Sequence, residues 1–260
     1  MKISLMTHRG AVRQENQDAV LVSGTIRTGD MNSPEVLETE GLPLLLAVVD
    51  GMGGYKGGAL AARILAESLA EGAENKNTFG DCFDVEADGR VLRRLLENAS
   101  AWMREAARDN PELGEMGATT AGILLREKSA LAFNCGDCRI YRLSGGELER
   151  LTREHSIVEL LYEKGEIDEE GMRTHPQKNI VTSSVSANFP DCFDLYTRGL
   201  SRCESDSFFL CSDGVWEALS ARHLTQCLNC PSPEAARELF DALLEAKCHD
   251  NVSFVWGPCL

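Results

Sequence analysis

The amino-acid sequence predicts an α+β fold, in which helices and antiparallel sheets form separate layers. Short apolar runs of strand length recur along the chain, and two longer stretches carry apolar residues at helical spacing. Strands and helices do not alternate in the regular βαβ manner of a doubly wound fold. The 260 residues, of which 43% are hydrophobic, can bury a large core, so we expect one domain over residues 1–260.

The N-terminal half is predicted to contain a polar loop, an exposed connection and two long helices among its strands. Apolar runs predict strands at Ile3–Met6, Ala19–Val22 and Leu44–Val49. The polar residues 9–18 predict a loop, and residues 29–41, which lack periodicity and carry Pro34, predict an exposed connection. Helical spacing is seen in two sets, Leu60, Ile64, Leu65 and Leu69, and then Val91, Leu95, Trp102 and Ala106.

The C-terminal half is predicted to begin as consecutive antiparallel sheet. From Ala118 the apolar period shortens, and Gly145-Gly146 is typical of a hairpin turn. Residues 156–190, called the excursion below, open with a short predicted helix and then become polar, which indicates a surface segment. The last predicted elements are a strand at Ser207–Cys211, a helix at Glu234–Ala246 and a strand at Val252–Trp256.

Charge and hydropathy exclude several classes of partner. The 41 acidic and 26 basic residues give a net charge of -15, which repels nucleic acid and anionic lipid surfaces. The longest apolar run, residues 42–49, is far shorter than the roughly 20 residues that span a bilayer. The N-terminal segment does not resemble a signal peptide, so we expect a cytoplasmic protein whose ten cysteines stay reduced.

Aspartates stand where several apolar strands are predicted to begin or end. They are Asp50, Asp137, Asp213 and Asp250. A single aspartate there is usually a turn residue, but several carboxylates fixed by a sheet can gather around a hard cation such as Mg²⁺ or Mn²⁺. In the glycine-rich run after Asp50, Gly51 can offer its backbone carbonyl as a further oxygen ligand. A phosphate-binding loop of the GxxxxGK[ST] type is absent from the sequence.

Six ordered sequence blocks resemble those of the type 2C metal-dependent (PPM) protein phosphatases, most closely the bacterial branch. The blocks are Arg13–Ala19, Asp50–Gly54, Gly117–Thr120, Gly136–Arg139, Cys211–Gly214 and Asp250–Val252. The resemblance implies a four-layer αββα sandwich of two antiparallel sheets flanked by helices. It also implies hydrolysis of phosphoserine and phosphothreonine by a water activated between two Mg²⁺ or Mn²⁺ ions, with phosphorylated proteins, the substrates of a serine/threonine kinase, as partners.

The same resemblance assigns roles to individual residues. Asp50 would bridge the two cations, Gly51 would offer its carbonyl, and Asp213 and Asp250 would complete the second site. Asp18 would act through a metal-bound water, and Asp137 would join Asp213 at a weaker third cation position. Arg13 would hold the substrate phosphate, because its guanidinium can donate two parallel hydrogen bonds.

Three departures from the family pattern stand out. Gln17 replaces a common glutamate, and Met52 replaces a histidine that could protonate the leaving alcohol. Beyond His175-Pro-Gln-Lys-Asn179 the excursion no longer follows the family sequence, so no catalytic role is assigned there.

Three other interpretations remain open from the sequence. Cys192 and Arg198 have the C-x5-R spacing of tyrosine phosphatases, although the residues between them alternate like a strand. Two CxxC pairs, Cys135/Cys138 and Cys227/Cys230, could form a zinc-binding module. The third interpretation is a catalytically impaired member of the phosphatase family that binds phosphoproteins without hydrolysing them.

Overall fold

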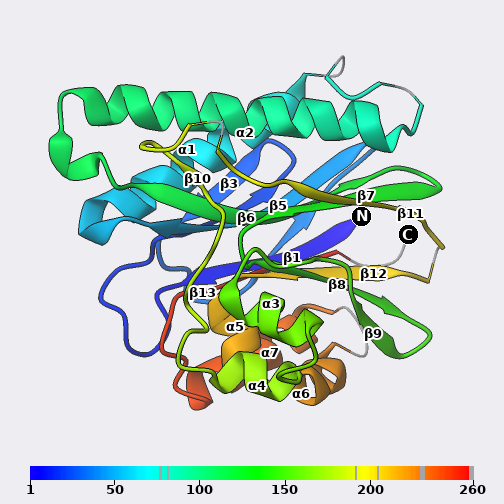
Figure 1. Ribbon diagram of the computed structural model, residues 1–260. Coiled ribbons are helices and arrows are strands. Elements are labelled where there is room, and N and C mark those ends of the chain that lie inside the picture. Colours follow the sequence, from blue (N-terminus) through cyan, green and yellow to red (C-terminus); the bar gives the residue numbers. More distant parts are fainter. Residues whose placement is uncertain (76–77, 81, 191, 204, 229–231, 258–260) are drawn as a thin grey trace.

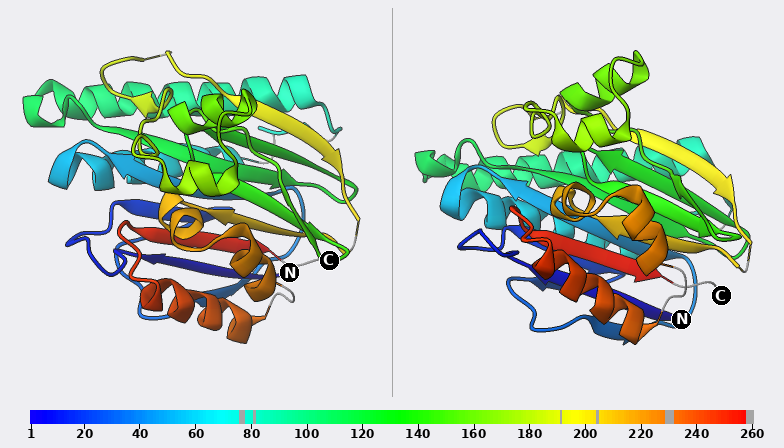
Figure 2. Two further views of the ribbon diagram at one scale, coloured as in Figure 1. Left: turned by 60° about the horizontal axis from the view of Figure 1, so that its bottom comes forward. Right: turned by 90° about the horizontal axis from the view of Figure 1, so that it is seen from below.

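The computed structural model describes residues 1–75, 78–80, 82–190, 192–203, 205–228 and 232–257. Two antiparallel sheets lie face to face, with helices on both outer faces (Figures 1 and 2). The four-layer αββα arrangement expected from the sequence is therefore confirmed. No helix in these residues is both long enough and apolar enough to cross a membrane.

The six-stranded sheet has the strand order β4-β1-β13-β12-β8-β9. Its strands are β1 (Lys2–His8), β4 (Glu35–Glu38), β8 (Arg139–Ser144), β9 (Glu147–Arg150), β12 (Ser207–Cys211) and β13 (Val252–Gly257). Three helices lie between β12 and β13 in the chain, namely α5 (Asp213–Ala218), α6 (Ala221–Cys227) and α7 (Pro233–Glu245). Trp216, Leu224 and Leu239 from these helices pack with Phe209 and Trp256 of the sheet.

The seven-stranded sheet has the order β11-β7-β6-β5-β2-β3, with the short β10 paired to β6. Its strands are β2 (Asp18–Val22), β3 (Thr25–Thr28), β5 (Leu44–Met52), β6 (Gly117–Leu125), β7 (Ser129–Cys135), β10 (Val185–Ser186) and β11 (Tyr196–Ser201). Its outer face is covered by α1 (Gly54–Glu74) and α2 (Val85–Arg108), and a short 3-10 helix, η1 (Pro111–Leu113), leads back to β6 (Figure 1).

Strand β5 shows why a continuously apolar run forms the centre of this fold. Alternate side chains point to opposite faces of a strand. Leu45, Ala47 and Val49 therefore pack toward α1 and α2, while Leu46 and Val48 fill the space between the two sheets. Because both faces are buried, the strand has no polar alternation.

Helix α2 illustrates how local sequence fixes an element. The Asp84 side chain accepts hydrogen bonds from the N–H groups of Glu86 and Ala87, which caps the helix, and Arg108 lies in its last turn. Its buried stripe packs on α1 and the sheet and consists of Leu92, Leu95, Leu96, Ala99 and Met103.

Three sequence predictions need correction. The connection at residues 29–41 contains an edge strand, β4, which pairs with β1 and has half-buried residues. The stretch from Ala118 to Leu151 is not one sheet, because the chain crosses from β7 in one sheet to β8 in the other at Gly136, whose φ of 104° suits glycine. The excursion contains α4 (Glu169–Thr174) and β10 besides the predicted helix α3 (Ile157–Glu163).

Candidate metal centre

The aspartates singled out in the sequence lie at the same end of both sheets. Asp18 begins β2 and stands directly opposite Asp50 of β5. Asp213 is the first residue of α5, just after β12, and Asp250 precedes β13. Asp137 lies where the chain crosses between the sheets. These residues come from different strands and loops, and Asp50 lies within β5 and not after it.

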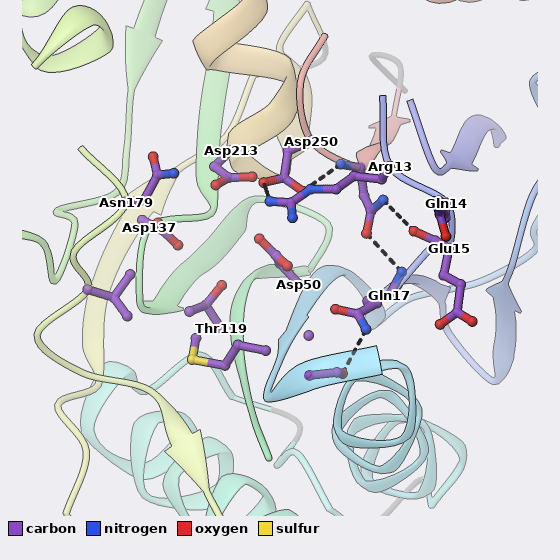
Figure 3. Close-up of a pocket in the computed structure, with 15 residues that line it drawn as sticks. Arg13, Gln14, Glu15, Gln17, Asp50, Thr119, Asp137, Asn179, Asp213 and Asp250 are labelled. Carbon is purple, nitrogen blue, oxygen red and sulfur yellow. Dashed lines mark hydrogen bonds and ion pairs between the residues drawn. The ribbon is translucent and has the colours of Figure 1, made fainter. Parts of the chain in front are cut away.

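A pocket of about 420 Å³ opens at this end of the molecule and is called the carboxylate pocket below. Its lining includes Asp50, Gly51, Asp137, Asp213, Asp250 and Arg13 (Figure 3). Asp18 lies outside this lining and instead borders a second pocket of about 360 Å³.

Asp18 is a buried carboxylate with an incomplete set of partners. Ser212 Oγ donates a hydrogen bond of 3.0 Å to its Oδ2, but Oδ1 has no partner in the described part of the chain. Burial, together with the negative charge of Asp250, raises the pKa of Asp18 from 3.8 to about 7.

The other carboxylates are also crowded. Burial raises the pKa of Asp50 well above its usual value, and the charges of Asp18 and Asp213 add to the effect. Burial and then the charge of Asp137 act in the same way on the pKa of Asp213. Burial and the charge of Glu154 raise the pKa of Asp137 to about 7. Like charges held together in this way favour a bound cation, which would relieve their repulsion.

The residues fit a hard divalent cation in chemistry, although their present orientation leaves the ligand set incomplete. Oxygen donors dominate the pocket, and Asp18 and Asp137 each have a buried Oδ1 atom without a hydrogen-bond partner. Within the described ranges, no group of three or more His, Cys, Asp and Glu side chains is arranged to hold a metal ion by itself. One reason is visible in the structure, because Asp250 is turned toward Arg13.

Arg13 and Asp250 form a two-pronged ion pair. Arg13 Nε donates to Oδ1 of Asp250 at 3.0 Å, and Nη2 donates to Oδ2 at 2.5 Å (Figure 3). The sequence interpretation placed these residues on different ligands, a phosphate and a cation. The two side chains instead satisfy each other.

Asn251 is a site residue whose role the sequence analysis did not assign. Its side-chain Nδ2 donates to the carbonyls of Arg9 and Glu15 at 3.2 and 2.9 Å, and its Oδ1 accepts the N–H of Gln17 at 2.8 Å. All three bonds reach the loop that carries Arg13. The available signal was its position directly after Asp250 in the last sequence block.

Gly51 and Gln17 each make a close contact with the start of α1. Gly51 continues β5 opposite Ala118, and the backbone takes up positive φ only later, at Gly53 and Gly54. A Cβ atom on Gly51 would lie 2.1 Å from the Gly58 carbonyl oxygen, so glycine is needed there for close packing. The Gln17 amide donates to the Gly54 carbonyl at 2.9 Å, a bond that a glutamate could not make.

The tyrosine-phosphatase interpretation finds no support in the geometry. Arg198 lies in β11 and pairs with Glu149, with Nη2 and Oε1 2.6 Å apart. The N–H groups of Cys192 and Asp194 donate to Phe189 and to the Ser183 hydroxyl, so they do not converge on an anion. The predicted strand begins only at Tyr196.

The zinc interpretation is also unsupported. The Cys135 side chain packs on the side of the sheet that faces α1 and α2, whereas Cys138 lies between the two sheets. Their side chains therefore occupy different layers. Cys230 of the second pair lies outside the described residues, and its partner Cys227 is half-buried near the end of α6.

The fold and the carboxylate pocket together define a layered sandwich with oxygen donors gathered at one end of its sheets. The family description of protein phosphatase 2C matches residues 23–245, and the chain therefore belongs to the protein phosphatase 2C family.

Among curated proteins, the chain is 26% identical over 259 residues to the serine/threonine protein phosphatase PstP of Mycobacterium tuberculosis. The match covers 98% of this chain but only 44% of PstP, so the chain spans less than half of that relative. The crystal structure of the serine/threonine phosphatase Stp1 from Staphylococcus aureus superimposes with a TM-score of 0.79 at 25% identity, over 98% of this chain and 94% of Stp1. The catalytic domain of PstP in complex with two manganese ions gives a TM-score of 0.75 at 24% identity, over 98% of each chain.

Proposed function

We propose that the chain, acting as one domain, hydrolyses phosphoserine and phosphothreonine in proteins with the help of two divalent cations, Mn²⁺ or Mg²⁺. The observation that carries this proposal is the convergence of four aspartates from both sheets on a pocket that Arg13 also lines. Family membership supports it, and PstP has been crystallised with two manganese ions.

The residues proposed to hold the cations are those that the family resemblance assigns. They are Asp50, Asp213 and Asp250 with the carbonyl of Gly51, then Asp18 acting through a water, and Asp137 with Asp213 for a weaker third cation. When bound, such cations supply a water of lowered pKa and positive charge close to the phosphate oxygens. The four pocket aspartates would set where that charge lies, because each lies in, or within two residues of, a strand or helix.

Arg13 would bind the phosphate. Its guanidinium is about half exposed, so it can turn from Asp250 toward a substrate without crossing a packed core. Once Asp250 is occupied with a cation, the fork of Arg13 is left to donate its two hydrogen bonds to phosphate oxygens.

Met52 lines the pocket where the family pattern has a histidine, and a thioether has no proton to give. The leaving serine or threonine oxygen therefore takes its proton from water or from a carboxyl group of the pocket. Phosphorylated proteins imply a serine/threonine kinase that makes them, and we propose that such a kinase shares the compartment of this chain.

The direct test is release of phosphate from a small aryl phosphate and from a phosphothreonine peptide, with and without Mn²⁺. We expect activity that depends on Mn²⁺, that chelation abolishes and that thiol alkylation leaves unchanged. Asp50→Asn should bring turnover close to background, whereas Asp84→Asn, which preserves the cap of α2, should not affect it. Phosphopeptide binding without turnover in Mn²⁺ would instead establish the binding module.

A further inference from the structure

Asn251 is a buried residue whose side chain is committed to one loop. It is 5% exposed, although it borders the carboxylate pocket. Its Nδ2 donates to the carbonyls of Arg9 and Glu15, and its Oδ1 accepts the N–H of Gln17. An asparagine amide has two N–H donors, and both are used here. The three bonds reach the loop on both sides of Arg13.

The loop that carries Arg13 has no regular structure of its own. Residues 9–17, all described by the structure, connect β1 with β2 and contain no strand or helix. The N–H of Ala11 donates to the carbonyl of Cys248 at 3.3 Å. A Cβ atom on Gly10, whose φ is 77°, would lie 2.1 Å from the carbonyl oxygen of Asp250. The loop therefore packs directly on residues 248–251.

The backbone of Asn251 is fixed to two of the pocket aspartates. Its N–H donates to Oδ1 of Asp250 at 2.8 Å. A Cβ atom on Gly214, the residue after Asp213, would lie 2.0 Å from the carbonyl oxygen of Asn251. Asn251 thus contacts the start of α5 through its backbone and the Arg13 loop through its side chain. The position of that loop relative to Asp213 and Asp250 is set through this one residue.

Arg13 depends on this loop for its position. Its side chain is about half exposed, and its guanidinium is held by the ion pair with Asp250. Figure 3 shows the side chain extending from the loop toward Asp213 and Asp250. When Arg13 releases Asp250 to bind a phosphate, its backbone is what keeps it at the pocket. A fixed backbone lowers the entropy that binding costs.

We propose that Asn251 is a positioning residue, which fixes the Arg13 loop on residues 248–251 and thereby keeps the Arg13 guanidinium where a phosphate group would bind. This inference rests on the proposed function, because that function assigns Arg13 to the phosphate. Asn251 acts through Arg13 and does not bind the substrate itself. The effect of removing its side chain should therefore depend on whether Arg13 is present.

The test is a double-variant cycle of Asn251→Ala and Arg13→Ala, assayed with Mn²⁺ on a phosphothreonine peptide and with inorganic phosphate as a competitive inhibitor. Amide hydrogen exchange of residues 9–17 is measured without metal, so one result does not depend on catalysis. Thermal melts establish that each variant is folded. Asn251→Ser, which keeps a polar group in the buried position, replaces Asn251→Ala if the alanine variant does not fold.

Ser68→Ala is the matched control. Ser68 is also buried, and its hydroxyl donates to the carbonyl of Leu95 at 2.7 Å, which joins α1 to α2. It does not line the carboxylate pocket. Loss of this bond should lower the melting temperature, but KM and the exchange of residues 9–17 should stay as in wild type.

We expect Asn251→Ala to raise KM for the peptide and Ki for phosphate by roughly 5- to 20-fold. This is less than the effect of Arg13→Ala, because hydrogen bonds to residues 29 and 30 still hold the ends of the loop. In the Arg13→Ala background, the same change should alter both constants less than about twofold. Mn²⁺ affinity by calorimetry should stay within about twofold of wild type, because the backbone bond to Asp250 remains. Exchange of residues 9–17 should become roughly 5- to 20-fold faster.

An equal loss from Asn251→Ala in both backgrounds would overturn the inference while leaving the phosphatase activity established. A fall in Mn²⁺ affinity as large as the rise in KM would also overturn it, because Asn251 would then act through the aspartates. Failure of wild type to hydrolyse a small aryl phosphate would overturn the proposed function, and with it the role in phosphate binding. Unchanged exchange of residues 9–17 would overturn the inference whether or not wild type is active.

Discussion

Replacement of Asp18 by asparagine should stabilise the metal-free protein at neutral and alkaline pH. The structure raises the pKa of Asp18 from 3.8 to about 7, chiefly through burial. Each tenfold change in proton affinity is worth about 1.4 kcal/mol, so the ionised carboxylate costs the folded chain at most roughly 4 kcal/mol above pH 7. Asparagine keeps an oxygen that can accept the Ser212 hydrogen bond but carries no charge.

The sign of the pH dependence follows from which state binds the proton more tightly. The folded chain holds the Asp18 proton up to about pH 7, whereas the unfolded chain releases it near pH 4. The stabilising contribution of this group is therefore complete below pH 4 and is lost as the pH rises to 7. The advantage of Asp18→Asn should accordingly be small at pH 4 and reach roughly 2–4 kcal/mol at pH 8, which corresponds to a rise in Tm of roughly 5–10 °C.

Thermal and urea unfolding in the presence of a chelator would measure this effect at pH 4.5, 6 and 8. The matched control is Asp206→Asn, which removes another fully buried aspartate. Burial acts to raise the pKa of Asp206, but the Cys203 N–H, Ser144 and Arg142 outweigh it and lower the pKa. Stability from Asp206 is present above its unfolded pKa, so this variant should be less stable than wild type at pH 8. A loss of stability in metal-free Asp18→Asn at pH 8 would refute the reasoning.

Three further predictions concern single side chains. Arg13→Ala should lower kcat/KM for a phosphothreonine peptide by roughly 30- to 150-fold, because charged hydrogen bonds to the phosphate are lost. Its Mn²⁺ affinity, measured by calorimetry, should stay equal or increase, because Arg13 no longer competes for Asp250. Weaker Mn²⁺ binding would contradict this role of Arg13. Gln17→Glu should strengthen Mn²⁺ binding by roughly tenfold, because it adds a negative charge near the cations. The variant should also lose about 1 kcal/mol of folding stability, because the hydrogen bond to the Gly54 carbonyl is lost. Unchanged Mn²⁺ affinity would show that residue 17 does not interact with the cations. Cys192→Ser should change phosphatase activity less than about twofold, and a loss of several orders of magnitude would revive the cysteine-nucleophile mechanism.

The sequence was sufficient where local pattern determines structure. The continuous apolar run of β5 could be recognised because burial on both faces leaves a direct signature, and α1 and α2 were visible from helical spacing. Edge strand β4 was missed because its residues are only half-buried, so its pattern is that of an exposed segment. The crossing at Gly136 was missed because two strands in different sheets have the same local pattern as a hairpin.

The candidate site shows the same division. Asp50, Asp137, Asp213 and Asp250 could be predicted because each adjoins or lies in an apolar strand. Their pairing with residues far away in the chain could not, since Arg13 reaches Asp250 across 237 positions. The bonds from Asn251 to the Arg13 loop depend likewise on the position of β13 beside β1. Contacts of this kind are set by tertiary packing and leave no local periodicity.

The proposed phosphatase activity depends most directly on cations bound by oxygen atoms at the carboxylate pocket. Anomalous diffraction from crystals soaked in Mn²⁺ would locate them, and calorimetry would count them. We predict two manganese peaks, both within coordination distance of Asp50, with Gly51, Asp213 and Asp250 as further ligands and Asp250 released from Arg13. Absence of manganese near Asp50, or coordination through cysteine sulfur, would contradict the central claim.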